Sequence, residues 1–396
     1  MKKRWTALAL GAAAVAVGAA LFRGPSLPAL APFVTIHSGG RVAEVALSPD
    51  GRFLADDAVF SGRVILYDTA TGQQSHALPV RTRLLIFSPD GRRLLTENTC
   101  ATPSSPVGNM QVWDTATGAQ LSQFVAPMTR ASQVRGWGPG IAAISRDLRW
   151  TVVDEAAGYA VYDTATGSIV KALPLPPGRS LAVFSPDRGL LAISSGTSET
   201  LQIWDTKTWR PVRMLGGPVS LVTGIRFSPD GSRLALGSKA GLAWWDTRAW
   251  KRDRRFAFPN PYGLTRDSFS FSSDGRSLLM SEVEPASGMH QVDCNTGSET
   301  LRVPSQKLQH VSILGDRAEA EILPTNWNVL SPDKRTTYCI WDTARKKPCY
   351  RIAIPPSANP PPVGDFQVHS NDLSADGHAF AAGGFDDGII RVWRLP

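Results

Sequence analysis

Short apolar stretches recur along most of this 396-residue chain, and compact polar turns separate them. Residues 42–47, which are apolar except for Glu44, precede the turn Ser48-Pro49-Asp50-Gly51, and the apolar run at 234–236 follows a similar turn. Runs of four to eight residues bounded by Gly, Pro, Asp and Ser are typical of β-strands. The pattern therefore predicts an all-β protein.

Two turn motifs repeat through the chain. The first follows the pattern Ser-Pro-Asp-Gly and occurs, intact or degenerate, at residues 48–51, 88–91, 145–147, 185–187, 228–231, 272–275 and 374–377. The second is an aromatic residue followed by Asp-Thr, at residues 67–69, 113–115, 162–164, 204–206, 245–247 and 341–343, with a degenerate copy at 292–293. Pro presets φ in the first motif, and Asp and Gly complete the reversal.

The spacing of the second motif gives the length of the repeat. Its aspartates stand at 68, 114, 163, 205, 246, 293 and 342, so successive copies are 41 to 49 residues apart. Four strands in roughly 40–45 residues is the spacing of β-propeller blades. A single four-stranded meander cannot bury both of its faces, whereas copies arranged radially cover one another. We therefore expect a propeller of four-stranded antiparallel blades over residues 33–396.

The number of blades follows from the same count. Eight units are favoured and seven remain the alternative, because the seventh unit is weak. Its strands are expected at 311–314, 320–323 and 337–341, and Ser331-Pro332-Asp333 is expected in a loop between strands.

The repeats resemble those of the WD40 family, most closely in the last unit. That unit runs from Asp372-Leu373-Ser374-Ala375-Asp376-Gly377 to Ile390-Arg391-Val392-Trp393 and ends at a third strand. The resemblance implies that a strand near 33–36 completes this blade. It also implies a protein that binds partners and is not an enzyme. The Gly-His dipeptide of the family is absent, which indicates a divergent bacterial member without the family's histidine-centred hydrogen-bond network.

The N-terminus has the features of an export segment. Lys2-Lys3-Arg4 precedes 18 uncharged, mostly apolar residues that end at Arg23. Residues 1–22 are therefore interpreted as a signal peptide or a membrane anchor, two alternatives that their length does not separate. Residues 23–32 form a Pro-rich linker. The basic start places the propeller outside the cytoplasm, in the periplasm or anchored to the membrane.

No catalytic motif accompanies the repeats. The six histidines are scattered without metal-ligand spacing, so neither a metal nor a cofactor is expected. The turn aspartates have a structural explanation as turn formers. A propeller hydrolase or lyase with its site at the mouth of the central channel is the alternative to a protein-interaction scaffold.

The expected partner-binding face consists of the loops between blades and between second and third strands. Aromatic and Arg side chains are typical of interface hot spots, and the candidates are Arg130, Arg135, Trp137, Tyr262, Arg266 and Trp327. The net charge is +8, with basic clusters at 207–213, 250–255 and 345–347. These clusters are interpreted first as protection of edge strands and second as a contact with an anionic membrane surface. A monomer that binds proteins and not nucleic acid is expected.

The four cysteines do not form a CxxC motif. Cys339 and Cys349 flank a predicted hairpin turn, so a disulfide between them is one prediction. Two unpaired small hydrophobic residues are the alternative.

Overall fold

The computed structural model describes residues 28–58, 62–98, 107–127, 140–155, 158–175, 181–194, 201–215, 222–238, 241–257, 269–272, 274–282, 288–304, 308–314, 317–322, 336–342, 347–354, 370–374, 377–384 and 388–395. It divides into two compact units, Pro32–Gly231 with Ser357–Pro396 and Met1–Ala31 with Ser232–Pro356. Each unit is considered by itself.

The described residues form eight four-stranded antiparallel sheets, here called blades one to eight in chain order. The count agrees with the eight units favoured by the repeat. The first four blades are β2 (Val42–Leu47), β3 (Phe53–Ala58), β4 (Arg63–Asp68) and β5 (Gln74–Leu78); β6 (Thr82–Phe87), β7 (Arg93–Asn98), β8 (Val107–Asp114) and β9 (Gln120–Pro127); β10 (Gly140–Ile144), β11 (Trp150–Glu155), β12 (Gly158–Asp163) and β13 (Ile169–Leu173); β14 (Leu181–Phe184), β15 (Leu190–Ser194), β16 (Leu201–Asp205) and β17 (Arg210–Leu215).

The remaining blades repeat the same order of strands. They are β18 (Val222–Phe227), β19 (Arg233–Ser238), β20 (Gly241–Asp246) and β21 (Arg252–Ala257); β22 (Phe269–Phe271), β23 (Ser277–Glu282), β24 (Gly288–Asp293) and β25 (Glu299–Pro304); β26 (Leu308–Leu314), β27 (Arg317–Ile322), β28 (Thr336–Asp342) and β29 (Lys347–Ile354); β30 (Ser370–Leu373), β31 (Ala379–Gly383) and β32 (Ile389–Arg394), completed by β1 (Val34–His37). The weak seventh unit is thus a four-stranded blade, and Ser331-Pro332-Asp333 lies outside the described residues.

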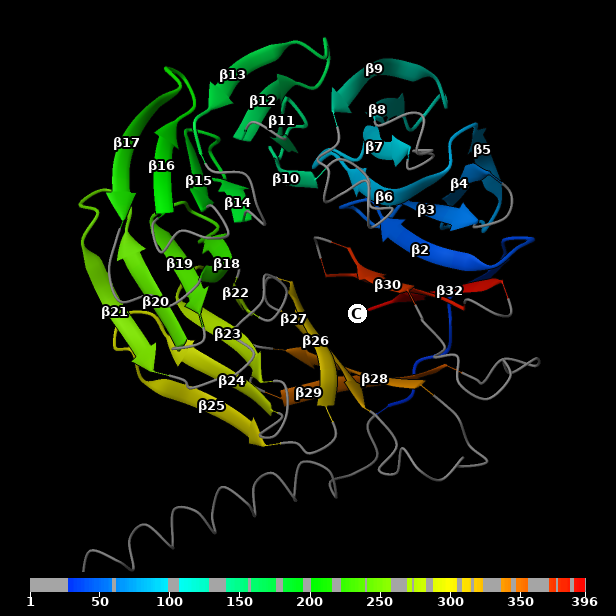
Figure 1. Cartoon of the computed structure of the whole chain (residues 1–396). Helices are drawn as coiled ribbons and strands as arrows, with labels where there is room; N and C mark the ends of the chain where they lie inside the picture. The colour runs from blue at the N-terminus through cyan, green and yellow to red at the C-terminus, as the bar shows by residue number, and fades with distance from the viewer. Residues whose placement is uncertain are drawn as a thin grey trace, which may run out of the picture. The chain divides into compact units, whose positions relative to one another are not determined.

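Blade eight joins the two ends of the chain. Its outer strand is β1, which pairs antiparallel with β32 and places Val34 opposite Val392 and Ile36 opposite Ile390. Figure 1 shows the last strands, in red, beside the first blade, in blue, and β30 and β31 both contact β2. The strand that the WD40 resemblance implies near residues 33–36 is confirmed.

The two repeated turn motifs bond to each other within a blade. The Thr69 hydroxyl donates to the Gly51 carbonyl at 2.6 Å, and the Thr115 hydroxyl donates to the Gly91 carbonyl at 2.7 Å. The backbone N–H of the same threonine also donates to the residue after the glycine, as from Thr69 to Arg52 at 2.9 Å. The motifs recur together because each one supplies hydrogen-bond partners to the other.

The turn aspartates accept hydrogen bonds from their own turns. Asp114 Oδ1 accepts from the backbone N–H groups of Ala116 and Thr117 and from the Thr117 hydroxyl, at 2.8–3.0 Å. The bonds from the Thr117 backbone and hydroxyl hold the pKa of Asp114 below its ordinary value. In the first motif the Ser48 hydroxyl donates to Asp50 Oδ1 at 2.6 Å. This supports the interpretation of these aspartates as turn formers.

The first three blades are apolar on both faces, and each face is covered by a neighbouring blade. In β4 the alternate residues Val64 and Leu66 belong to the cluster between blades one and two, whereas Ile65 and Tyr67 belong to the cluster between blades eight and one. We call such an interface a seam. Residues that point to opposite faces of one strand are thus buried in two different seams.

The fourth-strand turns approach the preceding blade closely. Gly167, at φ +69°, lies against Phe124 of blade two, and a Cβ there would come within 2.3 Å of the Phe124 Cβ. The Phe124 ring in turn stacks on Tyr162 at a centroid distance of 5.4 Å. In blade four Trp209 occupies the corresponding turn position at φ +50° and packs edge-on against Trp150. The seam is therefore tight at this point.

Gly167→Ala is expected to lower the free energy of unfolding by about 2–4 kcal/mol, because it adds both a clash with Phe124 and a strained positive φ. Urea denaturation followed by Trp fluorescence measures the change. Gly39→Ala is the matched control, since Gly39 also has positive φ (+74°) but no atom within 4 Å of a Cβ. That control should cost only about 1 kcal/mol, and equal losses in the two variants would contradict the tight seam.

Candidate functional site

The two ends of the blades differ in the lengths of their connections. The first and second strands are joined by five residues in seven blades (48–52, 88–92, 145–149, 185–189, 228–232, 272–276 and 374–378). At the other end, the connection between second and third strands varies from two residues, at 156–157, to thirteen, at 323–335. The constant turns carry the repeated Thr–Gly hydrogen bonds, which fix their length. The connections at the other end vary in length, and loops of this kind commonly carry function.

Five of the six partner-binding candidates belong to the connections between blades at 128–139 and 258–268, and Trp327 belongs to the connection between second and third strands at 323–335. Arg130, Arg135, Trp137, Tyr262, Arg266 and Trp327 all lie outside the described residues. Their role in partner binding stays a prediction.

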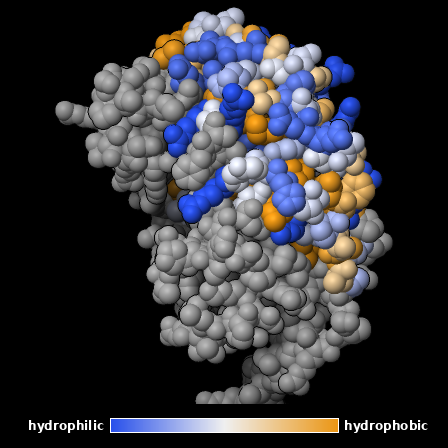
Figure 2. Space-filling view, turned by 90° about the vertical axis from the view of Figure 1, so that its right-hand side faces the viewer, coloured by the Kyte–Doolittle hydropathy of each residue, from blue (hydrophilic) through white to orange (hydrophobic). Residues whose placement is uncertain are grey.

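The outer strands present both apolar and basic side chains to solvent. The exposed large apolar residues include Leu121 and Val125 on β9, Ile169 on β13, and Val212 and Met214 on β17. Arg210 and Arg213 on β17 are also exposed, as expected for the basic cluster at 207–213. On the face shown in Figure 2, hydrophobic side chains form small groups among hydrophilic ones. Scattered apolar residues of this kind are ordinary for a protein surface.

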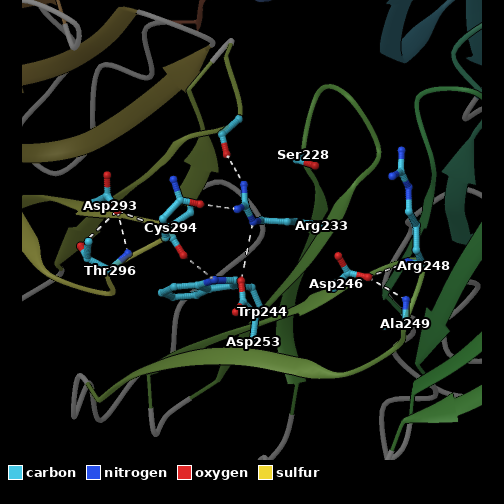
Figure 3. Close-up of polar contacts among 12 residues, drawn as sticks. Ser228, Arg233, Trp244, Asp246, Arg248, Ala249, Asp253, Asp293, Cys294 and Thr296 are labelled. Atoms are coloured by element: carbon cyan, nitrogen blue, oxygen red, sulfur yellow. Dashed lines mark hydrogen bonds and ion pairs between the residues drawn. The ribbon is translucent and has the colours of Figure 1, made fainter.

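The described cysteines differ in their surroundings. Cys294 is fully buried in the apolar cluster between blades five and six, and burial raises the pKa of its thiol to about 12. Its carbonyl accepts a hydrogen bond from the Trp244 indole at 3.1 Å (Figure 3). Cys294 thus behaves as a small core residue and not as a reactive thiol.

The strand register bears on the predicted disulfide. Cys339 in β28 pairs with Arg351 of β29, so it is not directly opposite Cys349, which lies where the register shifts between the pairs Ile340–Tyr350 and Trp341–Pro348. The side chain of Cys339 is outside the described part of the structure. The disulfide between Cys339 and Cys349 stays a prediction.

Arg233 links blades five and six at the end that carries the constant turns. Its guanidinium donates to Asn295 Oδ1 at 2.5 Å and to the Gly275 carbonyl at 3.3 Å. Asp253 lies 3.9 Å from the same guanidinium (Figure 3). These contacts join turns of neighbouring blades, so we assign Arg233 a structural role.

Carboxyl groups occupy the variable end of the first three blades. Asp57, Glu97 and Asp154 are each the fifth residue of a six-residue second strand, one residue before the connection to the third strand. Asp57 and Glu97 are buried, at 4% and 8% exposure. These side chains therefore lie next to the connections between second and third strands, which belong to the expected partner-binding face.

Glu44 and Asp57 form a cross-strand pair of acids in blade one. They are directly opposite each other in the β2–β3 register, so both side chains lie on one face of the sheet. Burial, followed by the nearby charges of Asp57 and Asp372, raises the pKa of Glu44 to about 7. A hydrogen bond from the Leu85 backbone N–H, on β6 of the next blade, partly offsets this shift by lowering the pKa of Glu44. Two like charges at this position would repel each other, and protonation of Glu44 relieves that repulsion.

Asp372 makes a similar link between blades eight and one. Its Oδ2 accepts a hydrogen bond from the Leu47 backbone N–H at 2.7 Å, and Oδ1 accepts from Leu373 at 2.9 Å. Burial raises the pKa of Asp372 to about 6. Asp372 and Glu44 thus each bond a backbone N–H on the first strand of the following blade. Such bonds satisfy edge groups that have no strand partner.

Glu97 lies alone in the seam between blades two and three. It shares a face of β7 with Leu95, a member of the apolar cluster of that seam. Its Oε1 accepts no hydrogen bond from the described residues. Burial raises its pKa to about 7. The ionised form of Glu97 is therefore disfavoured in the folded protein.

Glu97→Gln is expected to raise the free energy of unfolding at pH 8 by about 2–3 kcal/mol. The folded pKa exceeds the unfolded one, so wild-type stability falls as pH rises from about 4.5 to about 7. The glutamine side chain does not ionise, so the variant does not lose stability over this pH range. Urea denaturation at pH 8 and at pH 4 measures the free energy of unfolding of both proteins. The variant should be more stable than the wild type at pH 8 and equally stable at pH 4.

Asp114→Asn provides a control of opposite sign. Its pKa is lowered, so the charged form stabilises the fold above about pH 4 and this contribution is lost as pH falls. The asparagine variant should therefore be less stable than the wild type at pH 8. If Glu97→Gln were also destabilising at pH 8, the buried position of Glu97 would be wrong.

Sequence reasoning overlooked these buried acids, although a signal for them was present. Acids interrupt second strands that are otherwise apolar, in Leu54-Ala55-Asp56-Asp57-Ala58 and Leu94-Leu95-Thr96-Glu97. An acid at an inward position of a buried strand is costly. Alignment of the second strands on their Ser-Pro-Asp-Gly turns would have identified these positions.

The described residues also bear on metal binding and on membrane spans. No group of three or more His, Cys, Asp or Glu side chains among them could hold a metal ion. In the same part of the chain, no helix is both long and apolar enough for a membrane span.

Comparisons with known proteins point to WD-repeat proteins. No protein-family model matches the chain. It is 30% identical to WD repeat-containing protein VIP3 of Arabidopsis thaliana over 95 residues, 20% of this chain and 30% of that protein. It is 33% identical to pre-mRNA-processing factor 19 of Oryza sativa subsp. japonica over 118 residues, 30% of this chain and 20% of that protein. The chain therefore spans less than a third of the length of these curated relatives.

A longer but weaker match and a solved structure extend the comparison. Protein TOPLESS of Arabidopsis thaliana is 24% identical over 287 residues, 70% of this chain and 24% of that protein. The C-terminal WD40 domain of Sif2 superimposes with a TM-score of 0.66 at 12% identity, covering 94% of this chain and all of that domain. The fold is thus that of a WD40 β-propeller.

Proposed function

We propose that this chain is an exported or membrane-tethered WD40-type scaffold that binds protein partners through the variable ends of its blades. The unequal connections carry this proposal. Constant five-residue turns at one end form structural hydrogen bonds, whereas connections of two to thirteen residues at the other end are free to differ between blades. A propeller that presents variable loops on a rigid base is suited to recognition. The similarity to WD-repeat proteins agrees with this role.

The buried acids raise a second candidate function, catalysis, which has less support than the scaffold. Glu44 and Asp57 face each other, and a carboxyl group with a pKa near 7 suits general acid–base catalysis. The sequence alternative, a hydrolase or lyase at the channel mouth, would use such a pair. However, Glu44 and Asp372 already accept backbone N–H groups of the following blades. Their hydrogen bonds explain their positions without a substrate, so the scaffold is preferred.

A photo-crosslinking amino acid at Trp137 or Trp327 of the full chain is expected to capture a discrete protein partner in native cells. The same amino acid at Arg92, an exposed residue of a constant turn, is the matched control and should capture none. Mass spectrometry of the adducts identifies the partner. Equal capture from Arg92 and from both tryptophans would contradict recognition by the variable ends.

The N-terminus of the native protein tests the export half of the proposal. A tethered protein should begin at Met1 and fractionate with membranes, and a secreted one should begin near residue 20 in the soluble exported fraction. N-terminal mass spectrometry after fractionation measures both. A chain that begins at Met1 in the soluble cytoplasmic fraction would exclude export. Replacing Lys2, Lys3 and Arg4 with Ser should reduce export, because the basic start sets the orientation.

A further inference from the structure

Asp56 occupies a position where no other blade has an acid. It is the fourth residue of the second strand of blade one. The fourth residues of the corresponding strands in blades two to eight are Thr96, Val153, Ile193, Leu236, Met280, Ala320 and Ala382. Six of these are apolar, and the hydroxyl of Thr96 accepts a hydrogen bond from the Trp113 indole at 3.0 Å. Blade one therefore departs from the repeat at a single buried position.

The surroundings of Asp56 are mainly apolar. The residue is fully buried, at 0% exposure, and its cross-strand neighbours are Val45 and Ile65. Both neighbours belong to the apolar cluster in the seam between blades eight and one. Blade eight contributes Ile36, Ala381, Ile390 and Val392 to the same cluster. The polar groups that influence Asp56 are Asp57 on its own strand, Tyr67 on β4 and Ser38 after β1.

This seam is also where the N-terminal strand is held. β1 is an outer strand of blade eight, and backbone hydrogen bonds mark both of its ends: Phe33 N–H to the Val392 carbonyl at 2.7 Å and Ser38 N–H to the Gly388 carbonyl at 2.9 Å. Ile36 is the residue of β1 that is buried in the seam. Both carboxyl oxygens of Asp56 are buried and accept no hydrogen bond from the described residues. The nearby Ser38 hydroxyl, which would favour the ionised form, donates to the Gly40 carbonyl at 2.7 Å. Asp56 therefore receives little compensation when it is ionised.

We propose that the seam between blades eight and one is a proton-controlled latch, in which protonated Asp56 keeps the seam closed and ionised Asp56 loosens it and releases β1.

The direction of the effect follows from the burial of Asp56. Burial, and then the charge of Asp57, raises its pKa from 3.8 to about 7, and Ser38 opposes this shift only in part. When the seam opens, water solvates the carboxyl group and its pKa returns toward the ordinary value. Closure therefore becomes less stable as pH rises from about 4 to about 7, and the full loss is present above pH 7. Asp372, across the same seam and with its pKa raised to about 6, acts in the same direction.

Hydrogen exchange of the full chain, measured by mass spectrometry at pH 5.5 and pH 8, tests the latch. Protection factors corrected for the intrinsic pH dependence of exchange report opening of β1 and β2. In the wild type, protection of residues 34–37 should fall on the order of tenfold or more between the two pH values. Protection of β15 and β16 in blade four should change much less. In Asp56→Asn the pH-dependent loss at β1 should disappear.

Two further variants separate the latch from a general effect of buried acids. Asp56→Val carries the residue found at the same position of blade three, and it should abolish the pH dependence as Asp56→Asn does. Glu97→Gln removes a buried acid of similar pKa from a different seam, and it should leave the pH dependence at β1 unchanged. The latch is refuted if β1 keeps its pH dependence in both Asp56 variants, or if Glu97→Gln removes it equally.

Discussion

Blades one to three of this protein are apolar on both faces, and this constraint determines how they pack. The third strand of blade one shows it most simply, since Val64 and Leu66 are buried toward blade two while Ile65 and Tyr67 are buried toward blade eight. A four-stranded sheet of this kind cannot be stable alone, because one of its faces would remain in water. Each of these blades therefore depends on its neighbours, and the seams between them decide which substitutions are tolerated.

Close packing of the seams explains why the turns are so regular. A five-residue turn with a Ser–Asp hydrogen bond places the first two strands in a fixed relation, and the Thr–Gly hydrogen bond aligns the third and fourth strands with them. Gly167 lies against Phe124 so closely that no side chain fits. Trp209 occupies the same turn position in blade four and packs on Trp150. The turn before the fourth strand therefore packs closely against the preceding blade in both cases, with no side chain in blade three and with a large ring in blade four.

Much of the fold could be predicted from the sequence, because the turn motifs are local and periodic. The eight blades and the structural role of the turn aspartates follow from spacing and turn chemistry, whereas the completion of blade eight by β1 is what the WD40 resemblance implies. The buried acids were not predicted, since a single Asp or Glu in an apolar strand does not disturb the repeat. Whether Asp56 faces water or a seam depends on contacts between β3, β4 and blade eight, which are distant in sequence. The partner-binding candidates, such as Arg130 and Trp327, belong to segments without a repeat, and periodicity carries no information there.

The position of the N-terminal strand would connect the proposed export segment to the stability of the propeller. β1 begins at Val34, and Arg23 ends the apolar segment, so only the Pro-rich linker separates a retained anchor from the last blade. A tether this close in sequence would act on β1 and through it on the seam that contains Asp56. Cleavage near residue 20, the other proposed alternative, would leave β1 intact and remove only that attachment. The two proposed alternatives would therefore yield the same propeller and would differ in whether the closing strand is attached to a membrane.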